Sequence, residues 1–268
     1  MNQEELEAFR AYLTEEELSK NTIESYLFSV RKFFDSYPEL TKINIIGWKE
    51  QLMKDFSPKT VNLRLSGLMR YAESKEIFLK IKYVKIHKAV YTENVISKEQ
   101  FRYLLDCLKK DGKEQWVINI LVLGRTGARI SELLRLTKAD AVRGYADLYT
   151  KGKIRRIYIP ASLTADLSEY MKDMKDNDRL VCGNYKKPIT DRGFDQALKR
   201  FADEYHLPKK VMHAHSFRHF FAIEFLKANG NITLLADVLG HSGVNTTMIY
   251  TRLSGEEQKR QIDKAVNW

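Results

Sequence analysis

The sequence has few of the features that mark secreted or membrane proteins. It holds two cysteines, Cys107 and Cys182, without the paired spacing of a disulfide framework or a zinc site. Its longest apolar run, residues 116–123, is broken by Asn119 and is too short to span a bilayer. The first residues are acidic and polar, where a signal peptide is basic and then apolar. These absences predict a cytoplasmic protein that contacts no membrane.

Acidic residues are outnumbered by basic ones. Lys and Arg number 45 against 35 Asp and Glu, which gives a net charge of +10 and a pI of about 9.3. Six Glu fall within the first 17 positions, so the basic excess lies in the rest of the chain. Such an excess favours a polyanionic partner, nucleic acid first, which would place the protein at the nucleoid. A basic excess can also serve only to keep a protein in solution.

The first third of the chain is patterned as helices, with no internal repeat. Residues 58–75 carry an apolar stripe, and Ser57 followed by Pro58 is typical of a helix start. A shorter helix is expected around Trp48. The clearest stripe, with the period of one helical face, lies in residues 22–36 and consists of Ile23, Tyr26, Leu27, Val30, Phe33 and Phe34. We expect a bundle of four or five helices in residues 1–85.

A linker is expected at residues 82–94, which are rich in Lys, Tyr and Val and lack helical periodicity. Ser97 and Gln100 then match a capping box near the start of a second domain, residues 94–268. Strands are expected at 146–150 and 154–160, joined by a hairpin turn. Helices are expected at about 98–110, 114–124, 130–137, 163–175, 191–205, 216–229, 232–239, 245–253 and 256–266. The predicted fold is mainly α, with one small β-hairpin in the second domain.

Six residues of the second domain have side chains and settings that suit phosphoryl transfer. Breaking a DNA strand without a metal requires a nucleophile, an acid for the leaving oxygen and cations around the phosphate. No cluster of Asp and Glu in the sequence resembles a two-metal nuclease site, which favours a covalent route with no metal and no cofactor. The six candidates are Arg129, Lys151, His215, Arg218, His241 and Tyr250.

The motifs around these candidates follow one another in a definite order. They are Thr126-Gly127-Ala128-Arg129-Ile130-Ser131-Glu132-Leu133-Leu134, Lys151-Gly152-Lys153, His215-Ser216-Phe217-Arg218-His219, Leu239-Gly240-His241 and Ile249-Tyr250. In order and spacing this set resembles the tyrosine recombinase family of phage integrases and Xer proteins. Two positions depart from the family pattern, since Ala128 replaces a larger apolar residue and Thr150 replaces a glycine.

The resemblance implies a role for each candidate. Tyr250 attacks the scissile phosphorus and forms a 3′-phosphotyrosine. Lys151 protonates the departing 5′-oxygen, and His215 manages the tyrosine proton. The transition state is stabilised by Arg129, Arg218 and His241. The resemblance also implies that the partner is double-stranded DNA with paired recombination sites, and that accessory proteins are further partners. It implies that four protomers form a synaptic tetramer and exchange strands through a Holliday junction.

The first domain resembles the core-binding domain of the same family, a SAM-like helical bundle that grips DNA opposite the catalytic domain. This resemblance rests on Leu18-Ser19-x-Asn21-Thr22, on Tyr26 and on Ser57-Pro58-x-Thr60. The solvated face of any helix looks similar, so the choice of DNA contacts depends on the resemblance alone. The candidates for phosphate and base-edge contacts are Lys20, Asn21, Lys59, Asn62 and Arg64.

Plainer interpretations remain open for several of these residues. Arg129 can be a surface arginine paired with Glu132, and the role given to Lys151 can belong to Lys153. At the level of the whole protein, a type IB topoisomerase uses the same chemistry to relax supercoiled DNA without paired sites. A DNA-binding protein that has lost catalysis is a third alternative, which the complete set of six candidates argues against.

A zinc site is the alternative for the histidines. His215 and His219 stand one helical turn apart, and His213 is close to them in sequence. The cation of Arg218 between them would repel a metal ion, and no acidic residue completes the set. We therefore expect no metal, and His219 is interpreted as structural.

Overall fold

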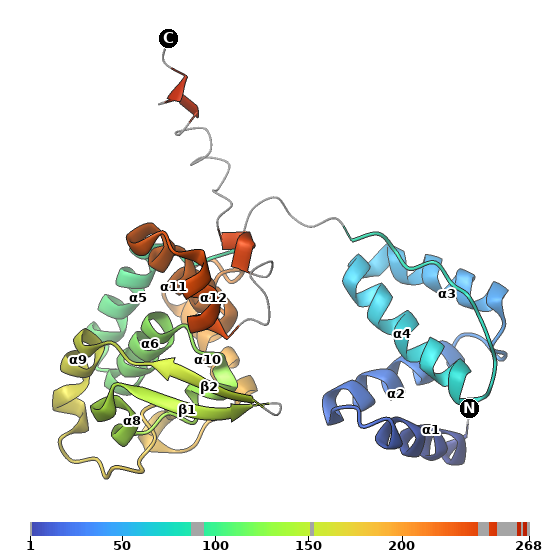
Figure 1. The fold of residues 1–268 in the computed structure, drawn as a ribbon, viewed down its shortest axis with the longest axis horizontal. Helices are drawn as coiled ribbons and strands as arrows, with labels where there is room; N and C mark the ends of the chain where they lie inside the picture. Colours follow the sequence, from blue (N-terminus) through green and yellow to red (C-terminus); the bar gives the residue numbers. More distant parts are fainter. Residues whose placement is uncertain are drawn as a thin grey trace. The chain divides into compact units, whose positions relative to one another are not determined.

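The structure is a computed structural model, and it describes residues 2–86, 94–150, 153–240, 247–250, 262–263 and 265–266. The chain divides into two compact units, Met1–Lys88 and Ala89–Trp268. The described part is mostly helical and holds one two-stranded antiparallel sheet (Figure 1). The predicted fold class is therefore confirmed. None of the described helices is long and apolar enough to cross a bilayer.

Four helices form the first unit. They are α1 (Gln3–Glu15), α2 (Lys20–Phe34), α3 (Lys42–Asp55) and α4 (Pro58–Ser74). Each helix begins after a polar residue whose side chain accepts a hydrogen bond from a backbone N–H of the first turn, a donor that the helix itself leaves open. These capping residues are Asn2, Ser19, Thr41 and Ser57.

The core of the first unit is rich in aromatic side chains. Phe33 of the predicted α2 stripe stacks on Tyr37 and meets the edge of Trp48, each with ring centroids 5.4 Å apart. Burial of a large apolar side chain of this kind contributes about 1.5–3 kcal/mol to stability. Helices α2 and α4 approach closely at Gly67, because a Cβ there would lie 3.0 Å from the Cα of Tyr26.

The predicted linker begins with a segment that is held against this bundle. The side-chain amide of Asn62 on α4 donates to the backbone carbonyl of Val84 at 2.9 Å and accepts from the backbone N–H of Val84 at 2.8 Å. Lys49 on α3 donates to the carbonyl of Lys82 at 2.7 Å. Residues 82–86 therefore belong to the first unit, and the rest of the predicted linker up to residue 93 lies outside the described residues.

The second unit is built around α6 (Glu114–Thr126), whose side chains are buried on nearly every side. A helix that is apolar all round is expected to lie inside a domain. It packs against α5 (Lys98–Lys110), α9 (Ala161–Met171) and α11 (Ala214–Asn229), as Figure 1 shows. Helix α10 (Asp191–Glu204) packs on α11 and contributes to the same hydrophobic core.

The hairpin of the second unit pairs β1 (Tyr145–Thr150) with β2 (Lys153–Tyr158), and Leu148 lies opposite Arg155. Because side chains alternate along a strand, Arg155 falls on the same buried face as Leu148 and Ile157. The two predicted strands are confirmed to within two residues at each end. Residues 151–152, where the sequence predicts a hairpin turn, lie outside the described residues.

The structure differs from the prediction after α6. In place of one helix at 130–137, the chain forms α7 (Ile130–Leu133) and α8 (Lys138–Arg143). Thr137 caps α8 and forms a capping box with Asp140, which starts a new helix at this point. A short 3-10 helix, η1 (Asn184–Lys186), is present where the sequence predicts none.

Two further elements bring the chain to the predicted site. Helix α12 (Ile232–Leu239) has the predicted bounds and ends at Gly240, whose φ of +61° is the left-handed conformation of a helix C-cap. The 3-10 helix η2 (Met248–Tyr250) lies within the predicted helix 245–253. Most of the predicted helix 256–266 falls outside the described residues.

Candidate functional site

The chain turns at Gly127, between α6 and α7, and so places Arg129 beside the end of α6. Gly127 has a φ of +60°, which favours glycine, and a Cβ there would collide with the ring of Phe221. Arg129 is the N-cap residue of α7, and its side chain is 43% exposed. Its Nη1 donates to Oε1 of Glu132 at 3.0 Å. The ion pair that the plainer interpretation requires is therefore present, and it fixes the guanidinium at this turn.

Glu132 is the buried anion of the site. Its side chain is 2% exposed, and it accepts hydrogen bonds from the backbone N–H of Arg129 at 2.8 Å and from Nη1 of Arg155. Burial raises the pKa of this carboxyl. The hydrogen bonds from Arg155 and from the Arg129 backbone lower the pKa by more than burial raises it, so that the net shift is downward. Glu132 is therefore ionised at neutral pH and holds two guanidinium groups in place.

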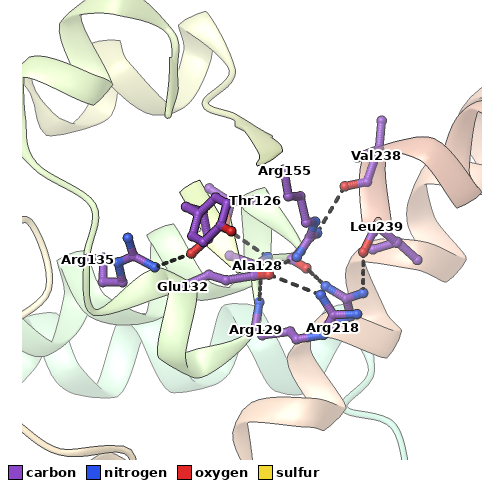
Figure 2. A network of polar contacts seen from close by, with 11 residues as sticks. Thr126, Ala128, Arg129, Glu132, Arg135, Arg155, Arg218, Val238 and Leu239 are labelled. Atoms are coloured by element: carbon purple, nitrogen blue, oxygen red, sulfur yellow. Dashed lines mark hydrogen bonds and ion pairs between the residues drawn. The ribbon is translucent and has the colours of Figure 1, made fainter. Parts of the chain in front are cut away.

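Arg155 is a functional candidate that sequence reasoning missed. It reaches from β2 to Glu132 on α7, and its Nη2 donates to the carbonyl of Val238 on α12 at 3.1 Å (Figure 2). Its Nε is buried without a hydrogen-bond partner among the residues that the structure describes. Burial is the main cause that lowers its pKa, and Glu132 opposes that shift. A Cβ at Gly240 would collide with this side chain, a second reason for glycine at that position.

Arg218 joins three segments that are far apart in the sequence. It projects from α11 and donates from Nη1 to the carbonyl of Gly127 at 2.7 Å and from Nη2 to the carbonyl of Leu239 at 2.6 Å (Figure 2). Its side chain is among the most buried of the chain. Burial, followed by repulsion from Arg155 and Arg129, lowers the pKa of Arg218 to about 10. The guanidinium still carries its charge at neutral pH.

This network gathers more positive than negative charge. Among the described residues of the network, three guanidinium groups, those of Arg129, Arg155 and Arg218, lie around the carboxylate of Glu132 (Figure 2). Holding cations close together in a partly buried site is costly unless an anion balances them. Guanidinium groups also match the geometry of phosphate oxygens. The arrangement is therefore suited to bind a phosphodiester.

Tyr250 lies next to this network. Its side chain is 7% exposed and packs with Ala222, Leu235 and Leu239. Burial raises the pKa of its hydroxyl, and the positive charges of Arg218 and Arg129 oppose the shift. The same two arginines are the candidate phosphate ligands, so the candidate nucleophile and the candidate anion site are electrostatically coupled.

The hydroxyl of Tyr250 meets His219, a histidine for which the sequence predicts only a structural role. Its oxygen lies 2.7 Å from Nδ1 of His219, within hydrogen-bond distance. His215, one helical turn earlier on α11, is exposed, and its ring packs against that of His219 with centroids 4.3 Å apart. Among the described residues, no three His, Cys, Asp or Glu side chains lie where they could hold a metal ion together.

Two of the six candidates fall outside the described residues. Lys151 comes between β1 and β2 in the sequence, and His241 comes directly after Gly240. The side chain of Lys153 is also not among those described. The choice between Lys151 and Lys153 therefore stays a prediction. Gly240, the last described residue before position 241, ends α12 beside Arg155.

The candidate DNA contacts of the first unit have different surroundings. Lys20, Asn21 and Lys59 are exposed, whereas the amide of Asn62 is engaged by Val84. The guanidinium of Arg64 lies 4.2 Å from the ring centre of the half-exposed Phe28, and burial lowers its pKa. Asn62 thus holds the segment at Val84 against α4, a role that the residue pattern of α4 alone does not predict.

Comparison with known proteins places the chain among DNA-processing enzymes. The sequence model of the phage integrase family matches residues 94–257. Tyrosine recombinase XerA of Pyrococcus furiosus is 26% identical over 274 residues, which cover 99% of this chain and 95% of that protein. Tyrosine recombinase XerC of Listeria welshimeri is 26% identical over 264 residues, which cover 93% of this chain and 78% of that protein.

Solved structures share the fold. A crystal structure of XerA recombinase matches 98% of this chain and 98% of its own, at 24% identity and a TM-score of 0.55. The Tn1549 transposon integrase, solved in complex with transposon right end DNA, matches 98% of this chain and 99% of its own. That match has 17% identity and a TM-score of 0.73.

Proposed function

This chain belongs to the phage integrase family, whose tyrosine recombinases break and rejoin DNA, and on that premise we propose that it recombines specific DNA sites through a 3′-phosphotyrosine intermediate. The observation that carries the proposal is the guanidinium network of Arg129, Arg155 and Arg218 beside the buried Tyr250. A tyrosine hydroxyl, with a pKa near 10, is a weak nucleophile until its proton is removed and the phosphate charge is neutralised.

In this proposal Tyr250 attacks the scissile phosphorus. The guanidinium groups of Arg129 and Arg218, with His241, stabilise charge on the equatorial oxygens of the transition state. The resemblance assigns the tyrosine proton to His215 and protonation of the departing 5′-oxygen to Lys151. The covalent bond stores the energy of the phosphodiester, so rejoining requires neither ATP nor a metal.

Two further residues act through these groups. Glu132 and Arg155 touch no reacting atom in the proposal, but they hold α7, β2 and α12 together around the phosphate site. A shift of about 1 Å in a positioned catalytic group is enough to slow a reaction by two orders of magnitude. Both are therefore positioning residues, with Glu132 setting the orientation of Arg129.

Paired DNA sites and a tetramer complete the proposal. Four protomers would join two sites and exchange strands in pairs through a Holliday junction, with the first unit gripping the DNA and accessory proteins as further partners. The family membership and the basic charge of the chain support DNA as the partner. Lys20, Asn21, Lys59 and Arg64 remain the proposed contacts, and Asn62 would have to give up its bonds to Val84 to join them.

Incubation with plasmids that carry two, one or no copies of a candidate site distinguishes recombination from DNA relaxation. We expect recombinant products from the two-site plasmid alone, because strand exchange requires two sites in one complex. Relaxation of the plasmid without a site, at a rate equal to the others, would instead assign the topoisomerase activity that uses the same chemistry.

Lys151→Ala is expected to slow DNA cleavage by about 10²-fold with little change in DNA affinity, because the leaving 5′-alkoxide then lacks a proton donor. A substrate with sulfur in place of that bridging oxygen should restore the rate, since a thiol with a pKa near 8.5 leaves as the anion. Single-turnover cleavage of both substrates checks this. Lys153→Ala is the matched control, and the opposite pattern in the two variants would move the role to Lys153.

A further inference from the structure

A histidine outside the six candidates makes the contact with the hydroxyl of Tyr250. Nδ1 of His219 lies 2.7 Å from that oxygen, and the two rings are tilted with centroids 5.2 Å apart. At this distance one of the two groups donates a hydrogen and the other accepts it. Which group donates decides whether His219 only holds the tyrosine or can also take its proton.

The charge state of the tyrosine favours donation from its hydroxyl. Burial raises the pKa of Tyr250 above its usual value near 10, although Arg218 and Arg129 oppose the shift. The hydroxyl is therefore protonated at neutral pH and has a hydrogen to donate. A neutral imidazole with its hydrogen on Nε2 has an acceptor lone pair on Nδ1, the atom that faces the tyrosine.

We propose that His219 is the base that accepts the proton of Tyr250 during cleavage. This inference rests on the proposed function, and it reassigns the tyrosine proton from His215, which the family resemblance indicates, to His219. The Oη–H bond breaks as an Nδ1–H bond forms, the freed oxygen bonds to phosphorus, and the bond from phosphorus to the 5′-oxygen breaks. The leaving oxygen takes its proton from Lys151. On rejoining, His219 returns its proton to the tyrosine.

The surroundings of His219 bear on how readily it accepts a proton. On α11 its neighbours are His215, whose ring is 4.3 Å away, and Arg218. From the other elements the site adds Arg129 and Glu132 at α7, Arg155 on β2 and Tyr250 on η2. The cations disfavour an imidazolium, and the phosphate that they bind offsets this repulsion. Proton transfer is thus favoured when DNA is bound at the site.

His215 and His219 occupy different places along α11. His215 lies nearer the N-terminal end of the helix and is exposed, whereas His219 is half-buried against the tyrosine. An exposed imidazole at the first turn of the helix is placed to donate to a phosphate oxygen. The half-buried one is placed to serve the nucleophile.

Adduct formation by the full-length protein on a nicked candidate-site duplex tests the proposal. The nick lets a short strand diffuse away, so that the covalent adduct accumulates. His219→Asn keeps an acceptor oxygen close to the position of Nδ1 but is not basic, and His219→Ala leaves space for free imidazole. The matched control is His206→Asn, an exposed histidine after α10 with a left-handed φ of +54°, which Asn tolerates.

We expect both His219 variants to bind DNA normally and to form adduct about 10²-fold more slowly at pH 7. Their rates should rise about tenfold per pH unit as hydroxide replaces the missing base below the pKa of the phenol. Imidazole should accelerate His219→Ala and leave His206→Asn unchanged.

A wild-type rate and pH profile in His219→Asn would overturn the inference, because a hydrogen bond alone would then suffice. A slow His219→Ala that neither higher pH nor imidazole accelerates would overturn it as well. These outcomes leave the proposed function intact. Absence of adduct from the wild-type protein on the same duplex would instead refute the proposed function itself.

Discussion

Arg218→Ala is expected to lower the rate of covalent adduct formation by about 10²- to 10³-fold, the usual cost of removing one charged group from a transition-state site. The substitution also leaves the buried carbonyls of Gly127 and Leu239 without the hydrogen bonds that Arg218 donates, so we expect a lower melting temperature. Single-turnover cleavage at saturating protein separates the chemical effect from any change in DNA affinity. Thermal unfolding measures the structural one.

Arg218→Lys resolves the two effects. It keeps the charge but lacks the fork that bonds both carbonyls, so we expect a folded protein that remains slower than wild type by at least about tenfold. Arg125→Ala is the matched control, since Arg125 sits at the end of α6 in an exposed ion pair with Asp166. Equal rates for Arg218→Ala and Arg125→Ala would contradict the role given to Arg218.

Glu132→Gln is expected to lower the free energy of unfolding by about 3–5 kcal/mol, because it leaves the buried guanidinium of Arg155 without its counter-charge. Chemical denaturation measures this loss. Asp147→Asn is the matched control, since Asp147 pairs with the exposed Arg156 on the same hairpin. An exposed pair of this kind contributes about 0–1 kcal/mol. Similar losses in the two variants would show that Glu132 is not buried against Arg155.

The difference between wild type and Glu132→Gln is expected to depend on pH. The pKa of Glu132 lies below its usual value in the folded chain, because its bonds to Arg155 and Arg129 outweigh burial. A depressed carboxyl pKa adds stability above the unfolded value of about 4.3, and that stability is lost as the pH falls through the folded value. The difference should therefore stay constant from about pH 7 to 5 and shrink below about pH 4. A decline already at pH 6 would indicate a raised pKa.

Local patterns were sufficient to predict much of the fold. The apolar stripe of α2, the Ser57-Pro58 start of α4 and the Gly240 end of α12 are properties of the helix itself. The spacing of Arg129, Arg218 and Tyr250 was enough to nominate residues that the structure brings to one network. Apolar stripes, helix caps and motif spacing involve residues that are close together in the sequence, so they can be recognised without the structure.

The parts that were missed depend on contacts between distant segments. Arg155 resembles a surface residue of a basic strand until β1 is in register and turns it towards Glu132. Asn62 resembles a solvated helix residue until Val84 folds back on it. The break between α7 and α8 was visible in the capping pattern of Thr137 and Asp140, but the apolar period around it suggested one helix.

The contact between His219 and Tyr250 also depends on segments that are distant in the sequence. The place of His219 after Arg218 gave no reason to prefer it to His215, because the position of η2 relative to α11 decides which ring the tyrosine meets. The helical spacing explains why both rings lie on one side of α11, and the packing of Tyr250 against α12 residues selects the second.

The covalent bond between protein and DNA is the central claim, and it is tested most directly by trapping the adduct on a nicked candidate-site duplex and mapping it by peptide mass spectrometry. We expect one adduct, formed without metal or ATP, with the DNA 3′-phosphate on the oxygen of Tyr250, and none from Tyr250→Phe. An adduct on another residue, or cleavage by Tyr250→Phe at the wild-type rate, would contradict it.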